Sequence, residues 1–455
     1  MRLSEAAQRV GGRGIAGVLA ATALSACAVL SRPPAPDPEP FREAAATFWL
    51  EATTRLDTAG QAAVEVRMTV PTSLASRRPP GSGTAARVRW TVEVLARPDG
   101  TELHETSWVE AVVGDSLARP PILQRSYPVP PGDILVNVTA EDEETGTRSS
   151  ERAEATVPEP GGAPAVVGLQ TDVFEGGEWR PVVDPAVHVT HDSLRVRAQV
   201  ANSTGPAARV VVERLEADVS VALPPFASGR PSDELTTRGV RLDGPIEDTT
   251  AVVTTSVDSL AGAVRAVLGP LEAGAYRVRV EQGDVFQDRA LVVRRGGFPE
   301  MPRVGDLVAA LAYITTDAEM RALTARLDPY LQRRAFDRFW GDRIADRRLA
   351  ASTVRAYAAR VEAANRLFST QKEGWKTDKG LAYVLFGPPA RLERGSGRER
   401  WIYGPGPVSG LTLDFLLSED RPADWPFEVW VLARGPAYDV AWERARRAWR
   451  RGEVP

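Results

Sequence analysis

Residues 374–380 read Gly-Trp-Lys-Thr-Asp-Lys-Gly, and the hydrophobic pattern of the chain changes on either side of this heptad. Before it, apolar side chains recur at helical spacing, whereas the run 381–386 that follows is apolar at every position. A short run of this kind, ended by glycine and proline, predicts a buried central strand. We therefore expect the heptad to form a sharp corner between a helix and a strand.

The residue types in the heptad suit such a corner. Gly374 and Gly380 permit positive φ angles where the chain must turn, and Trp375 can bury a large area against the sheet. Thr377 and Asp378 have side chains that bond to nearby backbone N–H groups and hold a tight turn. The alternative interpretation is a binding or catalytic site around Asp378. We favour the corner, because turn residues usually act locally.

Helix signals precede the heptad. Residues 316–319 have the spacing of a capping box, and Asp328-Pro329 places an N-cap residue and an N1 proline before a second helix. One apolar helix face is formed by Phe336, Phe339, Trp340 and Ile344. A second apolar stripe at helical spacing is formed by Val354, Tyr357, Ala358, Val361, Ala364 and Phe368.

Strand signals follow the heptad. Alternating or apolar segments at about 399–403, 411–417 and 427–432 predict further strands, and a last helix is expected at about 438–450. Residues 300–455 are therefore predicted to form an α+β domain in which helices come first and a small antiparallel sheet follows.

The third part of the chain resembles the GWxTD family of bacterial envelope proteins, whose name stands for Gly-Trp-any-Thr-Asp. The resemblance covers about 300–433 and rests on Gly374, Trp375, Thr377, Asp378, Phe339-Trp340, Phe386-Gly387-Pro388-Pro389 and a strand that contains Trp401. The family has no established reaction, so the resemblance implies a domain rather than an activity. The motif residues, together with Gly380 and Trp401, are the candidate binding residues.

The final helix has two interpretations. Its aromatic stripe of Tyr438, Trp442 and Trp449, with Ala445, is accompanied by several arginines. Residues 27–298 hold 27 basic and 38 acidic side chains, a net charge of −11, whereas residues 299–455 hold 26 and 21, a net charge of +5. The helix could therefore meet an anionic surface such as lipid headgroups or another protein. We favour a helix that covers its own core, as amphipathic helices mostly do.

Two long regions before the third part have the pattern of strands. Residues 64–70 and 88–94 alternate apolar with polar side chains, and residues 194–200 do the same further on. Residues 271–280 have a turn with glycine followed by an alternating strand. A linker rich in proline and glycine separates the regions at 158–164. We predict two all-β immunoglobulin-like sandwiches, at 41–157 and 165–295.

The N-terminus has the features of a lipoprotein signal peptide. Three arginines precede a short apolar run that ends in Leu24-Ser25-Ala26-Cys27, which resembles the bacterial lipobox. We expect cleavage after residue 26 and acylation of Cys27, the only cysteine, with a diacylglyceryl group and a further acyl chain such as palmitate. The proline-rich residues 27–40 then form an extended tether.

These features predict a protein anchored in a lipid bilayer of the cell envelope. Ala28, rather than aspartate, follows the cysteine, which in lipoproteins is typical of the outer membrane. No later stretch approaches the roughly 18 continuous apolar residues of a membrane-spanning helix. Whether the body of the protein faces the periplasm or the outside stays open.

The sequence lacks the residues that several common kinds of functional site require. One cysteine and three histidines rule out internal disulfides and a zinc site built from clustered Cys and His. His188 and His191 are expected in one strand, on opposite faces. The sequence has no phosphate-binding Walker loop and no nucleophile elbow. We expect no cofactor, no metal site and no nucleic-acid partner.

Two classes of function remain. The first is a non-catalytic binding or scaffolding lipoprotein whose partner is an envelope protein or a glycan. The alternative is an envelope hydrolase that pairs Asp378 with Asp414 or Glu428, since two carboxylates about 5–10 Å apart can hydrolyse a glycosidic bond. The sequence favours the first class, with no catalytic residue assigned, and leaves the oligomeric state open.

Overall fold

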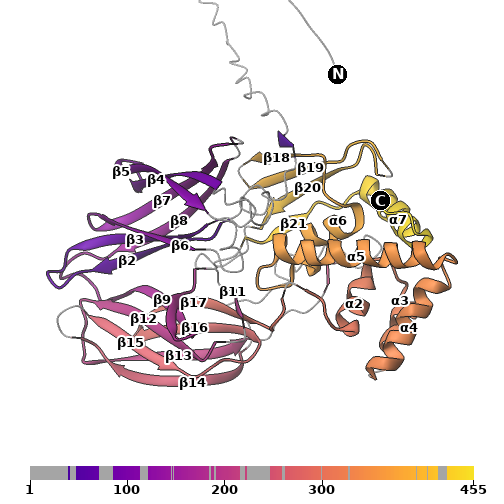
Figure 1. Ribbon diagram of the computed structural model, residues 1–455. Helices are drawn as coiled ribbons and strands as arrows, with labels where there is room; N and C mark the ends of the chain where they lie inside the picture. Colours follow the sequence, from indigo (N-terminus) through magenta and orange to yellow (C-terminus); the bar gives the residue numbers. More distant parts are fainter. Residues whose placement is uncertain are drawn as a thin grey trace, which may run out of the picture. The chain divides into compact units, whose positions relative to one another are not determined.

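The computed structural model describes residues 39–40, 48–70, 86–112, 121–144, 146, 148–183, 186–188, 191–215, 221–222, 246–258, 262–298, 300–325, 328–395, 397–406, 408–418 and 428–455 (Figure 1). The signal peptide, Cys27 and most of the tether lie outside these residues. Among the described helices, none is long and apolar enough to cross a bilayer.

The first β region is a two-sheet sandwich. One sheet has the order β2-β3-β6 and the other the order β5-β4-β7-β8. Valines on alternate positions of β3, β4 and β7 are buried in one core shared by both sheets, as period-two patterns predict. The strands are β2 (Leu50–Leu56), β3 (Ala62–Thr69), β4 (Ala86–Ala96), β5 (Glu102–Val112), β6 (Ile122–Pro128), β7 (Gly132–Asp142) and β8 (Arg148–Val157).

The second β region is also a two-sheet sandwich. The sheets have the orders β10-β9-β12-β15 and β11-β17-β16-β13-β14, and only the β11–β17 pair is parallel among the described pairs. The strands are β9 (Ala165–Glu175), β10 (Glu178–Pro181), β11 (Ala186–His188), β12 (Ser193–Ala201), β13 (Ala207–Leu215), β14 (Ile246–Ser256), β15 (Ala263–Leu268), β16 (Gly274–Gln282) and β17 (Val285–Arg294).

The expected common strand for the two histidines is wrong. His188 ends β11, whereas His191 lies beyond the end of that strand and is buried. Its Nε2 accepts a hydrogen bond from the backbone N–H of Leu271 at 3.2 Å. His191 therefore satisfies a buried backbone donor of the second sandwich, which is a structural role.

The third part combines helices with a small sheet, as predicted. Its sheet has the order β1-β18-β19-β20-β21, where β1 (Glu39–Pro40) comes from the N-terminus. The other strands are β18 (Arg391–Gly395), β19 (Arg398–Ile402), β20 (Thr412–Leu417) and β21 (Trp430–Leu432). The helices are α2 (Val304–Ala310), η3 (Leu311–Tyr313), α3 (Asp317–Thr324), α4 (Pro329–Gly341), α5 (Arg347–Phe368), η4 (Gly374–Lys376), α6 (Asp378–Phe386) and α7 (Pro436–Arg451).

The predicted caps are confirmed. The Thr316 hydroxyl accepts a hydrogen bond from the Glu319 N–H, and the Glu319 carboxylate accepts one from the Thr316 N–H, so both halves of the capping box are present at α3. The Asp328 carboxylate accepts from the Leu331 N–H, and Pro329 occupies the first position of α4.

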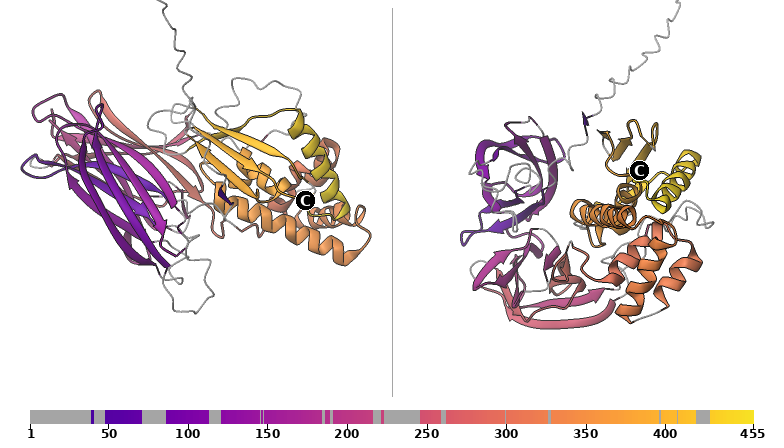
Figure 2. Two further views of the ribbon diagram at one scale, coloured as in Figure 1. Left: turned by 90° about the horizontal axis from the view of Figure 1, so that it is seen from above. Right: turned by 45° about the vertical axis from the view of Figure 1, so that its right-hand side comes forward.

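The predicted strand at 381–386 is wrong, because these residues form helix α6. Every residue from Gly380 to Phe386 is buried, so the helix has no polar face to reveal its period. A six-residue apolar run does not distinguish a buried strand from a buried helix. Helix α6 lies between the long helix α5 and the small sheet (Figures 1 and 2).

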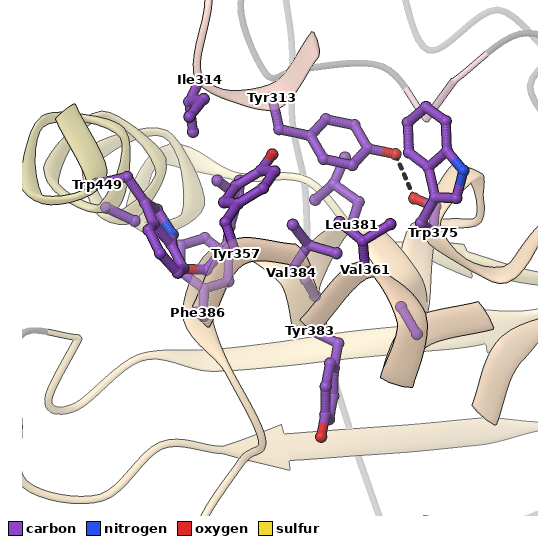
Figure 3. Close-up of a cluster of buried hydrophobic side chains, with 14 of the residues drawn as sticks. Tyr313, Ile314, Tyr357, Val361, Trp375, Leu381, Tyr383, Val384, Phe386 and Trp449 are labelled. Carbon is purple, nitrogen blue, oxygen red and sulfur yellow. Dashed lines mark hydrogen bonds between the residues drawn. The ribbon is translucent and has the colours of Figure 1, made fainter. Parts of the chain in front are cut away.

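Aromatic side chains dominate the core around α6. Trp375, Tyr313, Tyr357 and Trp449 are buried there, and their rings meet edge to face in the pairs Tyr313–Trp375 and Tyr357–Trp449 (Figure 3). Such contacts stabilise a pair by about 0.5–1.5 kcal/mol beyond the buried area. The core thus combines side chains of the helices around α6 with buried side chains from the small sheet.

Candidate functional site

The heptad forms a corner between two helices. Helix α5 ends at Phe368, η4 covers Gly374–Lys376, and α6 starts at Asp378. The predicted corner is therefore present, but it joins a helix to a helix rather than to a strand. The difference arises because residues 381–386 form a helix and not the strand that their apolar run predicted.

The two glycines serve close packing rather than a positive φ angle, which corrects their predicted role. Neither residue has a φ angle in the left-handed region. A Cβ atom on Gly374 would lie 2.0 Å from the carbonyl oxygen of Ala364. One on Gly380 would lie 1.8 Å from the carbonyl oxygen of Gly374. Glycine is needed here because backbones approach each other at distances that no side chain permits.

Trp375 is the anchor of the corner. Its side chain is 1% exposed, its N–H donates to Asn365 Oδ1 at 3.2 Å, and its carbonyl accepts from the Tyr313 hydroxyl at 2.6 Å (Figure 3). The indole Nε1 donates to the Glu373 carboxylate at 3.1 Å. The polar groups of this buried tryptophan are thus satisfied by α5, η3 and the residue before η4.

Thr377 starts helix α6. Its hydroxyl accepts a hydrogen bond from the Gly380 N–H at 3.0 Å and donates one to the Gly374 carbonyl at 2.7 Å. This is the N-cap geometry that its residue type favours, and it satisfies one of the free donors of the first helical turn.

Asp378 makes a long-range contact instead of the local turn contact that we predicted. Its carboxylate accepts the backbone N–H of Leu432 in β21 at 2.7 Å and two N–H groups of Arg434, at 3.1 and 2.8 Å. Burial tends to lower the pKa of Arg434, but the charge and hydrogen bonds of Asp378 outweigh it and raise that pKa. Asp378 therefore ties α6 to the end of the sheet.

The lysines of the heptad lie against aromatic rings. Lys376 pairs with Glu373 at 2.9 Å and lies 5.4 Å from the Trp375 ring centroid. Lys379 pairs with Glu399 at 3.1 Å and lies 3.9 Å from the ring centroid of Trp430. Both ammonium groups thus combine an ion pair with a cation–π contact.

Trp401 is fully buried. Its Nε1 donates to Glu399 at 2.6 Å, and its ring packs on those of Phe368 and Phe415. Trp375 and Trp401 are both candidate binding residues, but neither contributes an exposed aromatic surface. Trp375 is buried against Tyr313 of η3, whereas Trp401 is buried between Phe368 of α5 and Phe415 of β20.

The structure gives the three candidate carboxylates separate partners. Asp414 lies in β20 on the face opposite to the buried Leu413 and Phe415, and it pairs with Arg398 and Arg400. Hydrogen bonding by Arg400, followed by Arg398, lowers the pKa of Asp414, whereas a proton-donating acid needs a raised pKa. Asp378 instead binds Arg434.

Glu428 is exposed and accepts a hydrogen bond from Trp430 Nε1 at 2.8 Å. Its carboxylate is thus engaged by a neighbour two residues away. Among the described residues, no group of three or more His, Cys, Asp or Glu side chains could hold a metal ion.

The contacts of the corner involve residues that sequence reasoning missed. Asn365, Tyr313 and Arg434 lie 10, 62 and 56 residues from their partners in the heptad. Asn365 could have been found, because an asparagine beside the apolar stripe of a helix indicates a buried polar contact. Tyr313 and Arg434 carried no such signal.

The final helix covers its own core, as we favoured. Tyr438, Trp442, Ala445 and Trp449 of α7 are buried, and Trp449 Nε1 donates to the Leu385 carbonyl at 3.1 Å. Arg450 and Arg343 both bind the carboxylate of Glu319, which joins α7 and the end of α4 to the capping box of α3.

Similar solved structures are distant. Alpha-2-macroglobulin from Salmonella is 15% identical over 54% of this chain, with a TM-score of 0.18, and the chain spans 16% of that protein. A second match is a C-terminal fragment of intimin, solved in complex with the intimin-binding domain of its translocated receptor. It is 12% identical with a TM-score of 0.15, and the match covers 57% of this chain and 70% of the fragment. A tandem pair of titin immunoglobulin domains is 9% identical with a TM-score of 0.13, and 55% of this chain and 98% of the pair are covered.

Sequence comparison assigns the third part of the chain. No curated protein matches the sequence. The family model of the GWxTD domain matches residues 274–451. The match contains the heptad, the helices and strands β18 to β21 of the small sheet. It starts earlier than the predicted coverage, at the first residue of β16, and so includes β16 and β17 of the second sandwich. Residues 274–451 of this chain therefore match the GWxTD domain family.

Proposed function

We propose that this chain is a lipid-anchored protein of the bacterial cell envelope, most consistent with the outer membrane, whose GWxTD domain is a non-catalytic binding or scaffolding module. The non-catalytic part of this proposal is supported by the hydrogen bonds that the acid of the heptad makes within the protein. Asp378, the only acid of the heptad, accepts hydrogen bonds from Leu432 and Arg434 and ties α6 to β21. A carboxylate held in this way supports the sheet and is not presented to a substrate.

The anchoring part is supported by the N-terminal sequence. Leu24-Ser25-Ala26-Cys27 follows a basic and then an apolar segment, and Cys27 is the only cysteine of the chain. Two or more acyl chains would hold the protein stably in a bilayer, since each buried methylene contributes about 0.8 kcal/mol. The partner is an envelope protein or a glycan, reached from the anchored position.

The test of anchoring is mass spectrometry of the mature protein with membrane fractionation. We expect a product that begins at acylated Cys27 and sediments with the outer membrane. Cys27→Ser should yield an unacylated protein released from the membrane, whereas Ser31→Ala in the tether should behave as the wild type. A wild-type product with a free thiol, or with residues 1–26 still attached, would overturn the anchoring.

The test of the non-catalytic role compares two variants that disturb the same ion pair. Purified protein is incubated with cell-envelope glycan, and released sugars are measured for the wild type, Asp378→Asn and Arg434→Gln. We expect no release above that of heat-denatured protein. Release by the wild type that survives in Arg434→Gln and disappears in Asp378→Asn would establish the hydrolase instead.

A further inference from the structure

The N-terminal strand β1 pairs with the sheet of the GWxTD domain and not with the first sandwich, which follows it in sequence. Glu39 lies opposite Leu392 and Pro40 opposite Arg391, in antiparallel register with β18. The sheet order places β1 at the outer edge of the five-stranded sheet (Figure 1, indigo arrow beside β18). The end of the predicted tether is therefore bound to the domain that is most distant from it in sequence.

Strand β1 lacks one backbone donor because its second residue is a proline. Pro40 has no N–H, so the backbone donor that β1 supplies to this short ladder must come from Glu39. In a β-strand, alternate residues present their backbone groups to the same side, so Pro40 leaves the side of β1 that faces away from β18 without a backbone donor at this position. Such a strand can cover the edge of β18 without offering a new edge to another chain.

We propose that Glu39–Pro40 is a docking strand that fixes the N-terminal anchor to the GWxTD sheet and so holds this domain close to the membrane. The proposal rests on the proposed acylation of Cys27. Cys27 and Glu39 are twelve residues apart. A fully extended chain spans at most about 3.3–3.6 Å per residue, so the docked strand lies within about 40 Å of the anchored cysteine.

The charges of the chain agree with this placement. Residues 299–455 carry a net charge of +5, whereas residues 27–298 carry −11. A bilayer surface with anionic headgroups attracts the first and repels the second within roughly a Debye length of about 8–10 Å. Docking of the tether on the basic domain brings the favourable charge to the membrane.

The first experiment tests the docking itself and does not depend on acylation. In the unacylated Cys27→Ser protein, Pro40→Cys and Arg391→Cys place two thiols at directly opposed positions of an antiparallel pair, a separation that a disulfide can bridge. We expect mild oxidation to form an intramolecular disulfide in most molecules. The matched control pairs Pro40→Cys with Thr412→Cys, which lies in β20, three strands away from β1. Equal yields from the two pairs, or no disulfide in the first, would overturn the docking.

The second experiment tests the position of the domain. In acylated protein on vesicles with labelled anionic headgroups, a dye on Thr412→Cys reports proximity to the membrane by energy transfer. Glu39→Pro removes the N–H that faces β18, so we expect it to reduce the transfer at least twofold, whereas Glu39→Gln keeps the backbone and should match the wild type. Transfer unchanged by Glu39→Pro would refute the positioning role. Absence of all variants from the vesicles would instead refute the acylation, and the disulfide result would still stand.

Discussion

The carboxylate of Asp378 and the guanidinium of Arg434, 56 residues apart in sequence, form a two-bonded ion pair at 2.8 and 3.1 Å. The pair lies at the start of α6 and just after β21, and its side chains are 13% and 20% exposed. The same carboxylate accepts the N–H of Leu432, a donor in the last strand of the sheet. The aspartate of the motif therefore connects the helical corner to the sheet.

Asp378→Asn should destabilise the domain. The substitution removes the carboxylate charge that faces the largely buried Arg434 guanidinium, which costs about 3–5 kcal/mol for a fully buried pair and about 2–3 kcal/mol after allowance for this exposure. Urea denaturation measures the change in the free energy of unfolding. Asp414→Asn is the matched control, because its arginine partners lie on the outer face of the sheet, and it should cost less than about 1 kcal/mol. Equal losses for the two variants would contradict the connecting role of Asp378.

Gly380→Ala should prevent stable folding of the corner. The added methyl group would lie 1.8 Å from the Gly374 carbonyl oxygen, so the backbone of η4 or α6 must move. We expect a loss of more than about 3 kcal/mol, measured by thermal unfolding. Gly305→Ala in α2 is the control, because its nearest neighbour is a side-chain oxygen of Gln332 at 3.5 Å. This control should be neutral or stabilise by up to about 1 kcal/mol.

Tyr313→Phe should weaken the corner by about 1–3 kcal/mol, since the buried carbonyl of Trp375 loses its donor. Denaturant midpoints and the fluorescence of the tryptophans report the change. Tyr330→Phe is the control, since Tyr330 is 69% exposed and its hydroxyl should be dispensable. A Tyr313→Phe protein as stable as the control would show that the 2.6 Å hydrogen bond contributes nothing.

Acid should weaken the contact of α7 with α3. Hydrogen bonding by Arg450 is the main cause that holds the pKa of Glu319 well below its usual range; burial opposes it, and the Thr316 N–H and Arg343 reinforce it. Because the folded pKa is the lower one, ionised Glu319 stabilises the fold above the unfolded pKa of about 4.3, and this contribution is lost as the pH falls below that value toward the folded pKa.

Glu319→Gln should therefore lower the melting temperature at neutral pH by about 2–4 °C, which corresponds to about 1 kcal/mol for a partly exposed ion network. The difference from the wild type should shrink near pH 3. Glu453→Gln serves as the control: its pair with Arg451 also lowers the pKa of Glu453, but both side chains are exposed and screened by solvent, so the pH dependence should be much smaller. A difference between wild type and Glu319→Gln that is constant with pH would rule out the electrostatic origin.

The β-sandwiches and the helical caps were predictable because their signals are local. Alternate valines in β3 and β4 report one buried face, and Thr316 with Glu319 reports a helix start within four residues. The heptad as a corner was predictable for the same reason, since Thr377 bonds to Gly374 and Gly380.

The features that the sequence predicted wrongly depend on contacts with other segments of the chain. Residues 381–386 are apolar throughout because α5, the sheet and α7 surround them, so their helical period is invisible in the sequence. The roles of the two glycines depend on backbone oxygens of Ala364 and Gly374 that approach within the packed corner. No local rule places those atoms.

The sequence by itself determined the order of two β regions and a GWxTD domain, the helix caps and the position of the corner, because each follows from residues a few positions apart. The tertiary structure alone decided that α6 is a helix, that Asp378 binds Arg434, that Trp375 and Trp401 are buried, and that Glu39 pairs with Leu392. These outcomes require segments distant in sequence to pack together, and the free energy of that packing outweighs local preference.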